Sequence, residues 1–156
     1  SWMSHTILRP SYFMEVWLGP HLGFDFMNRK ATVYGAGQQR ISFISLGDVA
    51  EFAVRAVQTR AAGSSTIELG GPNAVSPLEA VRIFEELGGA PFEVQHIPEN
   101  ALQTQFATAT DSLQKSFAGL MLDYARGDEI PMEQTLRSTP VPLTSVRDYA
   151  RNVLGN

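Results

Sequence analysis

Apolar and polar residues follow two different spacings along this chain, and each spacing predicts one kind of element. Short apolar or alternating runs bounded by glycine, proline or polar residues are typical of strands. Such runs predict strands at residues 5–9, 32–34, 41–44, 66–69 and 92–97. The run at 5–9 is apolar, rich in β-branched residues and stopped by Pro10, so we expect a strand buried in the core.

Three helices are marked by residues that cap a helix N-terminus. Ser45 followed by Asp48 precedes an apolar helical pattern, and we assign Asp48 a structural role because free N–H groups stabilise a carboxylate there. The segment 76–79 (SPLE) supplies an N-cap, a proline and a glutamate in the order of a capping box, and its helix should end at Gly88-Gly89. Thr144-Ser145 begins a last helix that reaches Gly155.

Longer segments complete the prediction of the fold class. Residues 12–27 predict a short helix followed by a loop, and residues 99–126 a helical stretch broken once. The three prolines within residues 128–143 predict a loop. The alternation of strands and helices between residues 41 and 97 predicts an α/β fold in one domain, 1–156, that becomes more helical toward its end.

Composition excludes several functional classes. A net charge of −4 with scattered basic residues argues against a nucleic-acid partner, and no run is apolar enough to span a membrane. The absence of cysteine excludes disulfides and thiolate chemistry and agrees with the cytoplasmic location that we expect. None of the histidines, His5, His21 and His96, has a partner at metal-ligand spacing, so no metal site is predicted. We expect His5 and His96 to be hydrogen-bonded residues of strands.

Two glycine-rich segments have the composition of phosphate-binding loops. Gly35-Ala36-Gly37 has Arg40 where a dinucleotide-binding fingerprint needs its third glycine, so it predicts a turn between strands. Gly70-Gly71-Pro72 lies between a strand and a helix, where α/β proteins often bind ligands, but no P-loop lysine accompanies it. We favour a tight turn with positive φ at these glycines.

The segment 12–27 is rich in aromatic residues and has two interpretations. Its aromatic side chains pack in the core, or they form the apolar wall of a ligand pocket, as such residues often do. Its place just after the C-terminal end of a strand favours the pocket. His21 lies in this segment and is the one histidine that we keep as a site candidate.

Three segments, in order and spacing, resemble segments of NmrA-like proteins. Residues 6–15 (TILRPSYFME) are similar to the pattern T-I-L-R-P-x-x-F-M-E, residues 41–50 (ISFISLGDVA) to F-I-x-x-x-D-V-A, and residues 66–72 (TIELGGP) to Y-E-L-T-G-P. The chain thus resembles the C-terminal part of an NmrA-like atypical short-chain dehydrogenase/reductase. The resemblance implies the C-terminal portion of a Rossmann-like, NAD(P)-binding fold with a small, mostly helical substrate-side lobe.

The resemblance also implies which residues meet ligands. In these proteins the segment after the Arg-Pro strand passes the nicotinamide and enters the substrate pocket. Cofactor contacts are therefore expected from Pro10, Ser11, Tyr12 and Phe13. The substrate pocket is expected to be lined by Phe13, Trp17 and His21. The family often has Asn where this chain has Val16, which removes one polar contact.

Other motifs of the family have no counterpart in this sequence. A glycine-rich loop, a ribose-selecting residue and a Tyr-x-x-x-Lys pair would all precede residue 1. Without them we predict no catalytic residue in this chain and little cofactor affinity by itself. Some members of the group bind the dinucleotide without catalysing a reaction, so a sensor is also compatible with the resemblance.

Two functional hypotheses follow. In the first, the chain is a truncated NmrA-like protein, related to NAD(P)H-dependent reductases or isomerases of small carbonyl compounds and not catalytic alone. In the second, it is a stand-alone small-ligand-binding or self-association module without redox activity. In both, the edge of the first strand is open to association, so we expect a homo-oligomer or an N-terminal half as partner, besides a small-molecule ligand.

Overall fold

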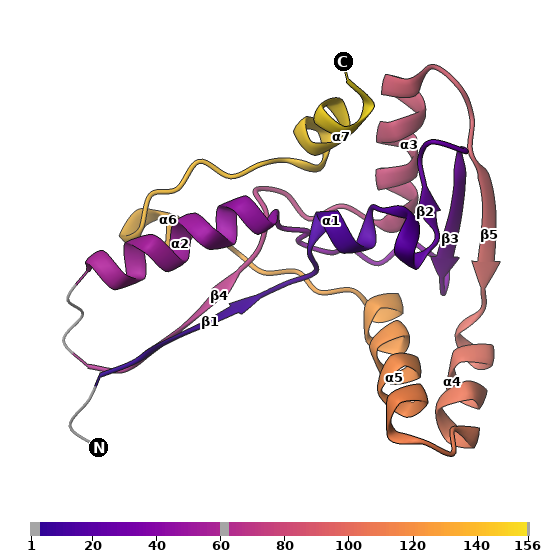
Figure 1. Cartoon of the computed structure of the whole chain (residues 1–156), viewed down its shortest axis with the longest axis horizontal. Helices are drawn as coiled ribbons and strands as arrows, with labels where there is room; N and C mark the ends of the chain where they lie inside the picture. Colours follow the sequence, from indigo (N-terminus) through magenta and orange to yellow (C-terminus); the bar gives the residue numbers. More distant parts are fainter. Residues whose placement is uncertain (1–3, 60–62, 156) are drawn as a thin grey trace.

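The computed structural model describes residues 4–59 and 63–155 and confirms the α/β class. Its elements form two groups that meet at the short helix α1 (Met14–Trp17). Figure 1 shows a long ribbon of two strands with a helix lying along it on one side of α1. A three-stranded sheet with a helical hairpin below it lies on the other side.

The first group is a parallel pair of strands with helices packed on one face. Strand β1 (Thr6–Pro10) pairs with β4 (Ser65–Leu69), with Leu8 opposite Ile67. Leu8 and Ile67 pack with Phe52 of α2 (Leu46–Gln58). The opposite face is open, because Ile7 is 48% exposed. The prediction of a fully buried first strand is therefore wrong, since the described elements cover only one of its faces.

The second group is a mixed sheet with helices packed around it. Strands β2 (Phe24–Asp25) and β3 (Lys30–Tyr34) are antiparallel, and β5 (Glu93–Ile97) runs parallel to β3. Helix α3 (Pro77–Gly88) buries Phe84 against the Phe24 ring, with 4.9 Å between ring centroids. Helix α7 (Val146–Leu154) packs against α3, while α4 (Glu99–Thr108) and α5 (Ser112–Arg126) form the hairpin.

Residues 41–44 join the two groups without forming the predicted strand. They are buried, and isolated bridges connect Ile41 to Val75 and to Asp128, and Ile44 to Phe13. The strand prediction is wrong because the backbone of residues 41–44 forms its hydrogen bonds with three separate segments, so no continuous strand ladder develops. The apolar pattern reflects burial, which a strand and a buried connecting segment share.

The capping signals identified the helix starts correctly. The Ser45 hydroxyl accepts a hydrogen bond from the Asp48 N–H, Ser76 and Glu79 form the complete capping box, and Ser145 caps α7. The helical stretch at 99–126 is broken once, between α4 and α5, as predicted.

Two predicted loops contain helical turns. Helix α6 (Glu133–Ser138) lies in the proline-rich segment, and the 3₁₀ turn η1 (Pro20–Leu22) lies between α1 and β2. The loop prediction for 133–138 is wrong because Pro131 and Pro140 lie outside the helix, where proline does not disrupt it. Buried Met132, at the N-cap, and half-buried Leu136 anchor this helix against β4.

The two glycine-rich segments require glycine for different physical reasons. Gly35 and Gly37 have φ of 73° and 71°, so the predicted turn between β3 and residues 41–44 is confirmed. Gly70 and Gly71 do not have positive φ, which corrects that prediction. They are small because other residues approach closely: a Cβ on Gly71 would lie 2.0 Å from the Phe43 carbonyl oxygen.

Candidate functional site

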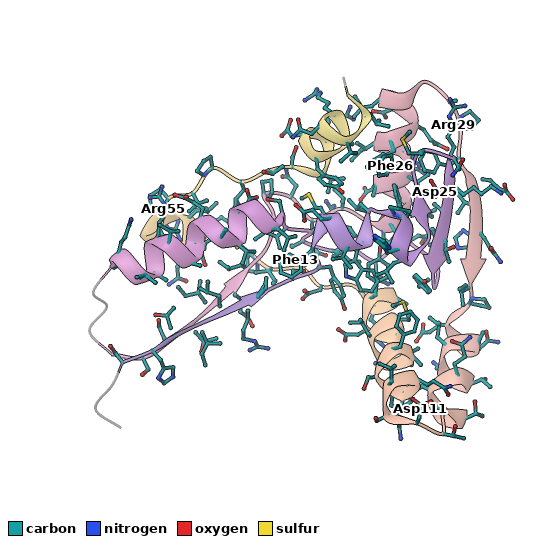
Figure 2. All side chains as sticks on the ribbon, viewed as in Figure 1. Phe13, Asp25, Phe26, Arg29, Arg55 and Asp111 are labelled. Atoms are coloured by element: carbon teal, nitrogen blue, oxygen red, sulfur yellow. The ribbon has the colours of Figure 1, made fainter. Side chains whose placement is uncertain are left out.

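The segment that follows β1 lines a hollow of about 390 Å³ together with the end of α5. We call it the β1–α5 cleft. Figure 2 shows Phe13 near the middle of the molecule, where the β1–β4 ribbon meets α1. The cleft is lined by Arg9, Pro10, Ser11, Tyr12, Phe13, Trp17, Leu120, Asp123 and Asp128.

Backbone hydrogen bonds fix this segment on both sides. The Ser11 N–H donates to the Leu69 carbonyl at 2.8 Å, which extends the β1–β4 pairing by one residue. The Ile44 N–H donates to the Tyr12 carbonyl at 3.1 Å, and the Met14 N–H donates to the Ile44 carbonyl at 2.9 Å. The chain therefore leaves β1 in a defined direction, and α1 begins immediately afterwards.

Three aromatic rings form a rigid wall behind the cleft. The Trp17 indole stacks on the Tyr124 ring with centroids 4.1 Å apart and planes 8° apart. Tyr12 meets both rings edge-on, at 4.8 Å from Trp17 and 5.3 Å from Tyr124. All three side chains are buried, so Tyr12 and Trp17 belong to the core and to the cleft wall at once. Phe24 and Phe26 of the same segment pack against Phe84 instead and do not line the cleft.

Two carboxylates bind the hydroxyls of the segment after β1. The Tyr12 hydroxyl donates to Asp123 Oδ2 at 2.8 Å, and the Ser11 hydroxyl donates to Asp128 Oδ2 at 2.6 Å. Burial, followed by the hydrogen bond and negative charge of Asp123, raises the pKa of Tyr12 far above its ordinary value. This shift is opposite to what a tyrosine general acid needs at neutral pH, so Tyr12 acts as a neutral donor.

The charge of the cleft decides which part of a dinucleotide its residues fit. Asp123 and Asp128 bring negative charge, and Arg9, the one cation in the lining, forms an ion pair with Glu68 at 3.4 Å. A diphosphate needs free N–H groups or cations, and these carboxylates would repel it. A nicotinamide ring, which is neutral when reduced and cationic when oxidised, fits the aromatic and carboxylate lining together with its donor carboxamide. The residues therefore fit the nicotinamide end and not the phosphates.

The structure brings together most of the residues singled out from sequence. Pro10, Ser11, Tyr12, Phe13 and Trp17 all line the cleft. His21 does not line it: this residue is exposed in the turn η1.

Histidines and candidate metal ligands lie elsewhere in the fold. His5 Nδ1 lies 2.9 Å from the Ser64 hydroxyl, and His96 Nδ1 lies 3.1 Å from the Gly35 carbonyl, so both are hydrogen-bonded as predicted. Across residues 4–59 and 63–155, no group of three His, Asp or Glu side chains is arranged to hold a metal ion.

Sequence reasoning did not find the residues that close the cleft from the opposite side. Leu120, Asp123 and Asp128 come from α5 and the residues after it, more than 100 positions from the segment that they face. Asp123 lies in an otherwise apolar helical run and Asp128 in a charged loop after it, and no local pattern marks either as a site residue. Only the fold, which returns α5 to the end of β1, reveals their place.

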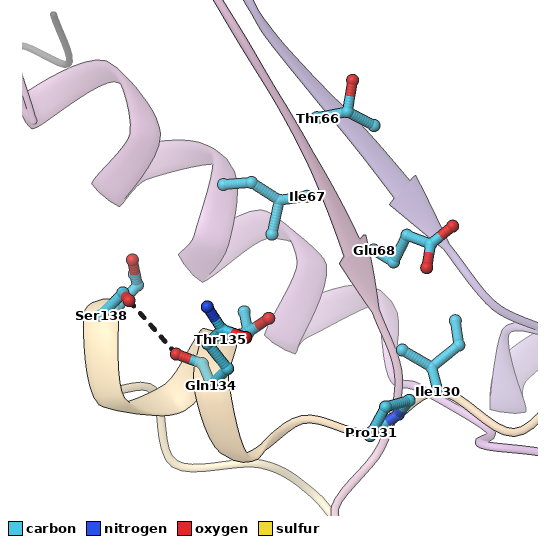
Figure 3. Close-up of a pocket in the computed structure, with 9 residues that line it drawn as sticks. Thr66, Ile67, Glu68, Ile130, Pro131, Gln134, Thr135 and Ser138 are labelled. Atoms are coloured by element: carbon cyan, nitrogen blue, oxygen red, sulfur yellow. Dashed lines mark hydrogen bonds between the residues drawn. The ribbon is translucent and has the colours of Figure 1, made fainter.

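A second hollow of about 360 Å³ lies between β4 and α6 and has fewer groups suited to binding a ring compound (Figure 3). Its lining includes Thr66, Ile67, Glu68, Ile130 and Gln134, without an aromatic side chain. The Ser138 hydroxyl donates to the Gln134 carbonyl within α6, as the dashed line in Figure 3 shows. The β1–α5 cleft is the stronger candidate because it combines aromatic walls with converging polar groups.

The fold and the comparisons with known proteins define the class. No known family profile matches the chain. The structure superposes on an NADPH-dependent quinone oxidoreductase from Escherichia coli with a TM-score of 0.71 at 18% identity, over 96% of this chain and 55% of that one. It superposes on an isoflavone reductase with a TM-score of 0.73 at 16% identity, over 95% of this chain and 52% of that one. The chain has the Rossmann-like α/β fold of NAD(P)-dependent reductases.

Two curated relatives are oxidoreductases by name, in agreement with this class and with the resemblance to NmrA-like reductases. The uncharacterized oxidoreductase YesF of Bacillus subtilis (strain 168) is 30% identical over 120 residues, which are 77% of this chain and 39% of that protein. The agroclavine dehydrogenase of Claviceps fusiformis is 29% identical over 102 residues, 64% of this chain and 35% of that enzyme. The chain thus spans less than two fifths of the length of either relative. No helix in the described ranges is long and apolar enough to cross a bilayer.

Proposed function

We propose that this chain forms the substrate side of an NAD(P)-dependent reductase of small carbonyl compounds. The β1–α5 cleft would receive the nicotinamide end of the cofactor and the substrate. The observation that carries the proposal is the convergence of Pro10, Ser11, Tyr12 and Phe13 on one aromatic-walled cleft. A structural neighbour solved with NADPH shares this fold over 96% of the chain, which supports the assignment of the cofactor class.

The chain's own residues have positioning roles in this proposal. Phe13 and Pro10 offer apolar contact to a planar ring, while the Ser11 and Tyr12 hydroxyls, held by Asp128 and Asp123, keep the segment in place. The bound cofactor would supply the hydride. The cofactor's phosphates would be held by groups outside the cleft, because its carboxylates repel them.

The proposal predicts that nicotinamide itself contacts the end of β1. Adding nicotinamide at millimolar concentration to ¹⁵N-labelled protein should shift the amide signals of Ser11, Tyr12 and Phe13 in NMR spectra. Phe13→Leu keeps apolar bulk but loses the ring face, which should weaken binding about fivefold. Phe106→Leu alters a ring on α4 outside the cleft and is the matched control. Shifts confined to the β4–α6 hollow, or unchanged affinity in Phe13→Leu, would contradict the proposal.

The open face of the β1–β4 ribbon favours self-association as a second candidate function. Within the described residues β4 is the one strand paired with β1, and Ile7 is 48% exposed on the uncovered face. Unpaired strand edges pair readily with other strands. A second copy would then cover this edge with its own β1.

The self-association candidate predicts a dimer of the isolated chain. Light scattering at micromolar concentration should give twice the mass of one chain. Ile7→Lys places a charge on the uncovered face and should shift the mass toward that of a monomer. Leu113→Lys is a control at an exposed site in the first turn of α5, in the helical hairpin, and should leave the mass unchanged. A clean monomer of the unsubstituted chain would rule out this candidate.

A further inference from the structure

We propose that the β1–α5 cleft selects ring compounds whose polar end is a protonated amine, and rejects ring compounds that carry a carboxylate. The inference rests on the proposed function in taking this cleft as the substrate site, and it names the class of substrate. Its apolar part is the lining by Phe13, Trp17 and Leu120, which suits a ring of aromatic size.

In this cleft the hydroxyl donors are already used within the protein, whereas carboxylate acceptors remain available to a ligand. The hydroxyls of Ser11 and Tyr12 both point to carboxylates within the protein, at 2.6 Å and 2.8 Å. Each of these bonds uses the Oδ2 atom, and a carboxylate accepts several hydrogen bonds through its two oxygens. A ligand group that reaches Ser11, Tyr12 and their two carboxylates must therefore donate hydrogen bonds.

The charge of the lining also favours a ligand that carries hydrogen-bond donors, and in particular a cation. Asp123 and Asp128 give two negative charges, and the Arg9 guanidinium lies 3.4 Å from Glu68 with 66% of its side chain exposed. A ligand cation gains attraction from both carboxylates and from the electron-rich faces of the surrounding rings. A ligand carboxylate is repelled by both aspartates, and Arg9, the one cation in the lining, is paired with Glu68. Amine-bearing rings should therefore be preferred over acidic ones.

A pair of probes equal in ring size and opposite in charge tests this selectivity. Calorimetric titrations with 1-naphthylmethylamine and with 1-naphthoate at pH 7 measure binding without cofactor or turnover. We expect the amine to bind about tenfold more tightly, as two carboxylates a few ångströms from the charge would produce in a solvated cleft. Asp123→Asn and Asp128→Asn should each reduce that ratio severalfold. Both variants keep an amide oxygen that accepts the hydroxyl of Tyr12 or Ser11.

The control removes a neighbouring charge that does not line the cleft. Glu129→Gln removes one negative charge, as each aspartate variant does, one residue from Asp128, and the amine-to-naphthoate ratio should stay unchanged. Three results overturn the inference: equal or tighter binding of naphthoate, no binding of either probe at millimolar concentration, or a ratio insensitive to both aspartate variants. Amine selectivity together with no nicotinamide contact at Ser11–Phe13 would support the inference while contradicting the proposed cofactor contact.

Discussion

Gly71→Ala should destabilise the protein by about 3 kcal/mol or more, the largest effect expected of any single added methyl group here. The new Cβ would lie 2.0 Å from the Phe43 carbonyl oxygen and 3.1 Å from its carbonyl carbon. Both contacts are backbone atoms of the buried connecting segment 41–44, so no side chain can rotate away. Relief requires moving the chain that joins the two groups of the fold, including the backbone that supports Tyr12.

The midpoint of urea unfolding, followed by circular dichroism, measures this effect. Gly88→Ala is the matched control, because its new Cβ meets only the Leu154 side chain, at 4.0 Å, and the residue ends helix α3. Alanine in place of a helical glycine should leave stability unchanged or raise it by about 0.5 kcal/mol. If both variants unfold at the same urea concentration, the close approach at Gly71 does not constrain the fold.

Asp48→Ala should cost about 3 kcal/mol, because it removes a buried carboxylate that joins two distant segments. Asp48 Oδ2 accepts from the Thr144 N–H at 2.8 Å, and Oδ1 accepts from the Thr144 hydroxyl at 3.0 Å. The side chain is 6% exposed, so water cannot easily replace the lost acceptor. The loss would detach the segment that leads into α7 from the start of α2.

Asp148→Ala provides a control at the equivalent position of another helix. Asp148 stands three residues after the N-cap Ser145, as Asp48 stands three residues after Ser45, but Asp148 is exposed. Its removal should lower the unfolding midpoint much less than that of Asp48. Asp48→Asn keeps one acceptor oxygen and should fall between the unsubstituted chain and Asp48→Ala. Equal losses for Asp48→Ala and Asp148→Ala would show that capping alone explains the role of Asp48.

Local signals in the sequence predicted the elements whose causes are local. The caps at Ser45, Ser76 and Ser145 fixed the starts of three helices because each signal acts within three residues. Residues 41–44 were misread because their burial comes from three separate segments. Asp48 was assigned correctly as structural, yet its bonds to Thr144 span 96 positions and leave no sequence pattern.

The same difference separates the two sides of the candidate site: one could be predicted from a local segment and the other could not. The side contributed by Pro10–Trp17 is one continuous segment, and a family resemblance was enough to locate it. The side contributed by Asp123 and Asp128 depends on how α5 returns to β1, so neither charge was anticipated. This second side determines the electrostatics of the cleft, and with it the expectation that phosphates are repelled and amines preferred.

The most direct test of the account compares nicotinamide with NADPH and NADH by calorimetric titration of this chain. In the proposed function the β1–α5 cleft binds the nicotinamide end alone. The dinucleotides should therefore bind no more tightly than nicotinamide, with dissociation constants in the millimolar range or above. Micromolar binding of NADPH or NADH would contradict this assignment, because it would require a phosphate site that the carboxylate-lined cleft does not provide.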